Sequence, residues 1–71
     1  MTNTFLLNYM IKEKGYKIGY IAEKMNLSRA GLYNKINGKS EFFASEIQCI
    51  SDILNLDLQE REKIFFNKVD I

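Results

Sequence analysis

Residues 17–39, KIGYIAEKMNLSRAGLYNKINGK, decide the fold predicted for this chain. The first half places apolar residues at positions 18, 21, 22 and 25, the spacing of one face of a short amphipathic helix. The pattern breaks at Asn26, and Asn is one of the few residues besides Gly that adopts the left-handed conformation at a helix end. Ser28 then follows as an N-cap. The stretch therefore predicts two short helices joined by a tight turn.

The second of these helices is predicted to span residues 28–37 and to be narrow on its buried side. Leu27 and Leu32 have the spacing of a hydrophobic staple, which fixes how the chain enters a helix. Leu32 and Ile36 form the buried edge, and Gly38 ends the helix. The side chains left on the outside are Arg29, Ala30, Tyr33, Asn34, Lys35 and Asn37.

This outward set has the chemistry of DNA recognition. Arg pairs with guanine, Asn with adenine, and a small apolar group contacts the thymine methyl. A helix-turn-helix places the first turns of its second helix in the major groove. The alternative is a helical hairpin whose polar face is only solvated, but solvated faces usually mix acids and bases. No acid occurs in this set.

The run IAEKMNLSRAGLYNKINGK, residues 21–39, resembles the helix-turn-helix of the lambda-repressor-like family, also called the Cro or XRE family. The matching features are Ala22 in the first helix, the turn at Asn26 and Leu27, the apolar Leu32 and Ile36, and the terminal Asn37-Gly38 pair. Two positions depart from the family: Ile18 replaces a phosphate-contacting Gln, and Asn26 replaces a common Gly. The resemblance covers residues 5–66 and implies an all-α, compact five-helix domain that binds operator DNA.

The resemblance also implies which residues contact DNA. Base edges would be contacted by Arg29, Ala30, Tyr33 and Asn34, with Arg29 opposite guanine. Phosphate contacts are expected from Lys17, Lys24, Ser28, Lys35, Asn37, Lys39 and Ser40. Asn37 is included because it matches the family position. For Lys39 and Ser40 the alternative is an ordinary polar loop.

Charge is distributed unevenly along the chain. Residues 11–40 hold seven basic against two acidic side chains, a net charge of +5. Residues 41–71 hold three basic against seven acidic side chains, a net charge of −4. Such asymmetry is expected when one face of a protein meets a polyanion. The basic segment coincides with the predicted helix-turn-helix.

Length and composition limit the possible functions. A chain of 71 residues makes at most one small domain, here residues 1–71, and 46% apolar residues favour a folded globule. One Cys and no His exclude a disulfide framework and the usual zinc sites, and Cys49 is expected to be a buried thiol. No nucleophile has a base partner and no phosphate-binding loop occurs, so we expect no enzyme, cofactor or metal. Without a signal peptide or long apolar run, we expect a cytoplasmic protein that enters no membrane.

Three further helices are predicted outside the central stretch. Residues 4–14 form the first, capped by Asn3 or Thr4, and residues 44–54 form the fourth. The start of the fourth is poorly marked because no capping hydroxyl lies near position 43. The last helix begins with Asp57 as N-cap and Glu60 three positions later, a capping box.

The chain has more apolar and aromatic residues than the predicted buried faces of its helices require. Phe5, Leu6 and Tyr9 suggest that the first helix is covered from two sides. Other expectations are that Phe42 and Phe43 anchor their loop to the core, and that Leu58 and Val69 are buried. Neighbouring residues on a helix cannot share a direction, so one of Phe65 and Phe66 should be exposed. That residue would either contact a second copy of the chain or pack beneath the first helix.

The sequence thus predicts a small transcriptional regulator, most simply a repressor of the phage or mobile-element type, that binds double-stranded DNA as a dimer. The alternative is an interaction protein, an antirepressor or antitoxin, that acts through a partner regulator. In that case the acidic half with Phe65 and Phe66 would contact the partner.

Overall fold

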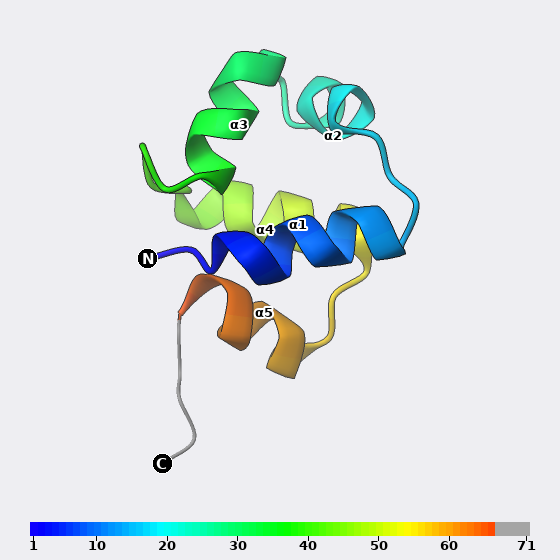
Figure 1. Ribbon diagram of the computed structural model, residues 1–71, viewed down its shortest axis with the longest axis vertical. Helices are drawn as coiled ribbons and strands as arrows, with labels where there is room; N and C mark the ends of the chain where they lie inside the picture. Colours follow the sequence, from blue (N-terminus) through cyan, green and yellow to red (C-terminus); the bar gives the residue numbers. More distant parts are fainter. Residues whose placement is uncertain (67–71) are drawn as a thin grey trace.

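Five helices make up the part of the chain that the computed structural model describes, residues 1–66, and these residues form no strand (Figure 1). The helices are α1 Thr4–Glu13, α2 Ile18–Lys24, α3 Arg29–Ile36, α4 Ala44–Leu54 and α5 Leu58–Phe65. The radius of gyration is 11.2 Å, close to about 11 Å for a compact chain of this length. The prediction of a compact all-α chain is confirmed. None of the helices within residues 1–66 has the length and apolar character needed to cross a membrane.

Helix α1 lies between α3 and α5 and contacts both (Figure 1). Its first residues are bonded to the ends of both neighbours. The Asn3 N–H donates to the carbonyl of Ile64 at 2.6 Å, and the Thr4 hydroxyl donates to the carbonyl of Ile36 at 2.6 Å. Both carbonyls lie in the last turn of a helix, where no partner exists within the helix itself. The start of α1 is therefore hydrogen-bonded directly to the last turns of α3 and α5.

The core contains aliphatic side chains from all five helices. The largest fully buried side chains are Leu7, Ile21, Leu32, Ile36, Ile50, Leu54 and Ile64. Phe42, from the loop before α4, packs edge-on against Phe65 with ring centroids 5.4 Å apart. Because each helix supplies at least one of these residues, no helix can leave the bundle without exposing apolar surface.

The turn between α2 and α3 has the predicted local structure. Asn26 is left-handed with φ of 57°, and Ser28 caps α3 by accepting a hydrogen bond from the Gly31 N–H at 2.9 Å. Gly38 follows α3 with φ of 81°. Asn55 ends α4 in the same left-handed conformation as Asn26, with φ of 52°. Asn residues thus end two helices without glycine.

Reciprocal capping begins α5 as predicted. The Glu60 N–H donates to Asp57 Oδ1 at 2.8 Å, and the Asp57 N–H donates to Glu60 Oε1 at 2.9 Å. Helix α4 begins with only half of this device, because the Phe43 side chain has no acceptor. There Glu46 Oε1 accepts from the Phe43 N–H at 2.8 Å. This bond explains how α4 starts without a capping hydroxyl.

Leu6 is half-buried against the core, but three other apolar side chains that were predicted to be covered are exposed. Phe5 is 81% exposed and Tyr9 is also exposed, because the neighbouring helices cover only the opposite face of α1. Leu58 is 71% exposed, since it is the first residue of α5 and that end is not covered. Cys49 is half-buried instead of buried. Val69 lies outside the described residues.

Lys35 points inward, so the prediction that it lies on the outer face of α3 is wrong. Only 9% of the residue is exposed. Its ammonium forms an ion pair with Glu46 at 2.9 Å and donates to the carbonyl of Glu41 at 3.2 Å. The same ammonium lies 4.4 Å from the centre of the Phe43 ring. Phe43 therefore covers this ion pair from outside and does not anchor the core as predicted.

The Glu46 carboxylate is stabilised in its charged form. Burial by itself raises the pKa of Glu46, but the Phe43 N–H and the Lys35 ammonium together bring that pKa below its ordinary value. A carboxyl group whose pKa is lower in the folded state stabilises that state at pH values above its unfolded pKa. The stabilisation is lost as the pH falls through the folded pKa.

We predict that Glu46→Ala lowers the free energy of unfolding by about 1–3 kcal/mol, because it leaves the buried Lys35 ammonium without its counter-charge. Glu46→Gln retains an acceptor for the Phe43 N–H and should cost less. Urea denaturation at neutral pH measures both effects. On acidification the parent chain should lose more stability than Glu46→Gln. Equal unfolding free energies for the three proteins at neutral pH would contradict this role of Glu46.

Candidate nucleic-acid interface

The outer face of α3 consists of the residues that the helix does not turn into the bundle. Leu32, Lys35 and Ile36 are turned into the bundle. The exposed residues of α3 and of its C-cap are Arg29, Ala30, Tyr33, Asn34 and Asn37. They offer a guanidinium, a methyl group, a phenol and two amides, and none is acidic. All four residues predicted to contact bases therefore lie together on one exposed face.

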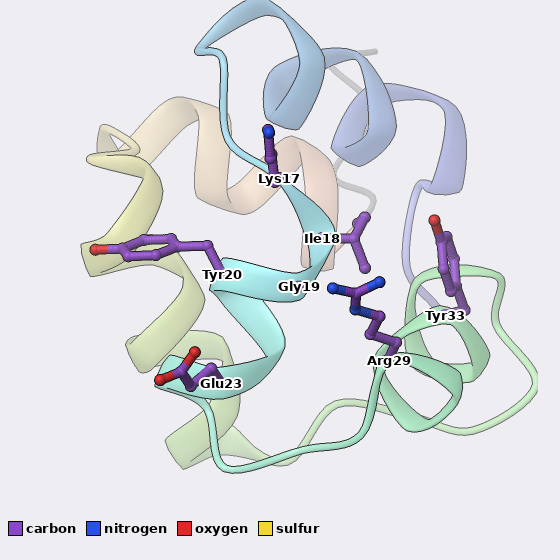
Figure 2. Close-up of a pocket in the computed structure, with 7 residues that line it drawn as sticks. All are labelled: Lys17, Ile18, Gly19, Tyr20, Glu23, Arg29 and Tyr33. Carbon is purple, nitrogen blue, oxygen red and sulfur yellow. The ribbon is translucent and has the colours of Figure 1, made fainter.

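An open hollow of about 630 Å³ lies beside this face, between the first turns of α2 and α3 (Figure 2). It is lined by Lys17, Ile18, Gly19, Tyr20, Glu23, Arg29 and Tyr33. In Figure 2 the Arg29 side chain extends from α3 toward Gly19, whereas the side chains of Tyr20 and Glu23 point away from Arg29. Arg29, a predicted base contact, and Lys17, a predicted phosphate contact, thus line the same hollow.

The predicted phosphate contacts other than Lys35 are all exposed. They are Lys17, Lys24, Ser28, Asn37, Lys39 and Ser40. Lys17 precedes α2, Lys24 ends it, and Lys39 follows α3, so cations lie at both ends of the two-helix unit. The Ser28 oxygen accepts the capping bond from Gly31, which leaves its hydroxyl hydrogen available as a donor. Lys35 does not belong to this set, because its ammonium is paired inside the bundle.

Tyr16 and Tyr20 support one of these cations. Their rings stack with centroids 5.9 Å apart, and the Lys24 ammonium lies 5.7 Å from the centre of the Tyr20 ring. Such cation–π contacts restrain a lysine without neutralising it. The sequence interpretation did not predict this series of contacts from Tyr16 through Tyr20 to Lys24, although the three positions are four residues apart, the spacing of neighbours on a helix.

Several exposed apolar side chains lie on α1 and α5, outside the two helices just described. Phe66 is 54% exposed while Phe65 is only 6% exposed, so the prediction that one of the pair is exposed is confirmed. Phe65 cannot be the dimer contact, because it packs against Phe42 inside the bundle. The exposed Phe5 and Tyr9 of α1 and Leu58 of α5 add further apolar area to these two helices.

Comparison of the chain with protein-family models, with curated proteins and with solved structures gives no match. The resemblance of residues 21–39 to the lambda-repressor-like family therefore stays a prediction.

Proposed function

We propose that this chain is a sequence-specific regulator of transcription, most simply a repressor, that binds double-stranded DNA through a lambda-repressor-like helix-turn-helix formed by α2 and α3. The observation that supports it best is the outer face of α3, which presents Arg29, Tyr33 and Asn34 with no acid among them. In this fold the first turns of the second helix enter the major groove. A regulator of this kind acts in the cytoplasm, where its operator lies.

Each side chain on this face has a chemically matched target in the groove. Arg29 offers a planar pair of donors for guanine O6 and N7, and Asn34 offers a donor and an acceptor for adenine. The Ala30 methyl suits the methyl group of thymine. Tyr33 lies one turn after Arg29 and offers a phenol that both donates and accepts.

Phosphate contacts would hold the two helices in register on the duplex. Lys17 and Lys24 flank α2, and Lys39 follows α3, so the three cations lie at the ends of the two proposed DNA-binding helices. Ser28, Asn37 and Ser40 add neutral donors. Contacts of this kind give affinity without sequence information. Lys35 contributes from inside the protein, where its ion pair with Glu46 restrains α3.

The exposed apolar residues of α1 and α5 favour contact with another protein, either a second copy of the chain or a partner regulator. Phe66 would either join two copies of the chain on a palindromic operator or bind a partner regulator, as an antirepressor or antitoxin does. A dimer is the simpler proposal, because one short helix contacts few base pairs and symmetric operators match two-fold symmetric proteins.

We predict that Arg29→Ala weakens binding to a duplex selected from a random pool by about 1–3 kcal/mol and relaxes specificity at one base position. Anisotropy titrations against single-base variants of the duplex measure both effects. Lys63→Ala is the matched control, since it removes one positive charge from α5, away from the proposed face, and should bind normally. Equal weakening on every duplex would make Arg29 a phosphate contact, and unchanged binding would remove it from the interface.

Two copies of the chain should bind one palindromic duplex with half-sites about one helical turn apart. Analytical ultracentrifugation of the complex measures this stoichiometry. Phe66→Ser should reduce it to one copy and lower the free energy of unfolding by less than about 1.5 kcal/mol, because only about half of the ring is buried. A monomer both alone and on DNA would rule out the dimer and leave Phe66 to a partner protein.

A further inference from the structure

Gly19 occupies a place in α2 where its backbone does not require glycine. It is the second residue of the helix, and its φ lies outside the left-handed region that favours glycine. Alanine is the better helix former at such a position. A glycine in a helix whose φ does not require it is expected where a neighbouring side chain occupies the space that a Cβ would fill.

The neighbour that needs this space is Arg29. A Cβ built on Gly19 would lie 2.6 Å from Nη2, 2.9 Å from Nε and 3.0 Å from Cζ of Arg29. These three atoms belong to the planar guanidinium, so the group lies flat against the α-carbon of Gly19. Any side chain at position 19 would displace it.

The guanidinium lies against Gly19 with no polar partner among residues 1–66 to direct it there. Within residues 1–66, Arg29 makes no hydrogen bond or ion pair, and the one ion pair present joins Lys35 to Glu46. Glu23 lines the same hollow, but its carboxylate points away from Arg29 in Figure 2. The N–H donors of Arg29 are therefore unoccupied. A donor group that already lies in its binding orientation, with no partner to give up, loses less free energy when it binds a ligand.

We infer that Gly19 is a positioning residue for DNA recognition: by lacking a side chain, it leaves room for the Arg29 guanidinium to lie across the first turn of α2, the orientation in which Arg29 meets DNA. Gly19 itself touches no DNA in this arrangement. The inference rests on the proposed function, because it assigns a use to the orientation of Arg29 on the proposed DNA-binding face.

A double-mutant cycle tests the inference. Gly19→Ala, Arg29→Ala and the double variant are titrated against the selected duplex. Gly19→Ala should raise the Kd about fivefold or more, the lower end of what one good base contact provides. In the Arg29→Ala background the same substitution should leave the Kd unchanged, because nothing remains to be displaced. Equal effects in both backgrounds, or tighter binding by Gly19→Ala, would overturn the inference.

A second measurement needs no DNA. The chain has two arginines, Arg29 and Arg61, so its NMR spectrum should contain two arginine Nε–H signals. Gly19→Ala should move the Arg29 signal and leave that of Arg61 in place, while urea denaturation shows a stability no lower than that of the parent chain. An unmoved Arg29 signal would overturn the positioning role. If the parent chain binds no duplex, the proposed function fails, whereas this signal still tests the contact between Gly19 and Arg29.

Discussion

The rotation of α3 about its own axis is the constraint on which the rest of the structure depends. Leu32 and Ile36 have no exposed surface, and Lys35 forms its ion pair with Glu46 between them in sequence. The two close-packed aliphatic side chains set which face of α3 turns inward, and the 2.9 Å ion pair links that face to the start of α4. Helix α3 has eight residues, and three of them, Leu32, Lys35 and Ile36, are buried. Once these three face the bundle, helical geometry determines which of the other residues face outward.

The remaining features of the candidate interface follow from this orientation. With α3 fixed, the left-handed Asn26 and the Ser28 cap determine where α2 lies relative to it. The first turns of the two helices then enclose the hollow in which Arg29 rests against Gly19. Lys17 and Arg29 line this hollow together with Glu23, while most acids of the described residues lie in α4, α5 and the segments beside them. One face of the molecule is thereby suited to a polyanion.

The features that the sequence predicted correctly depend on residues close together in the chain. The turn at Asn26, the cap at Ser28 and the capping box at Asp57 each require only three or four consecutive positions. Lys35 was misplaced because its partner lies eleven positions away, and only the packing of α3 against α4 brings the two together. The contact between Arg29 and Gly19 is likewise non-local. Helical spacing showed that only one of Phe65 and Phe66 could be buried, but not which one.

The most direct test of the central claim is the salt dependence of binding to duplex DNA, measured by fluorescence anisotropy at about 50 and 200 mM salt. Three phosphate-contacting lysines per chain, six per dimer, predict a loss of affinity on the order of a thousandfold between these concentrations, because each contact releases condensed counterions. Replacing Lys17, Lys24 and Lys39 with Ala should flatten this dependence, whereas Lys63→Ala should not. No binding at 50 mM salt, or an affinity independent of salt, would contradict the proposal that this basic face binds DNA.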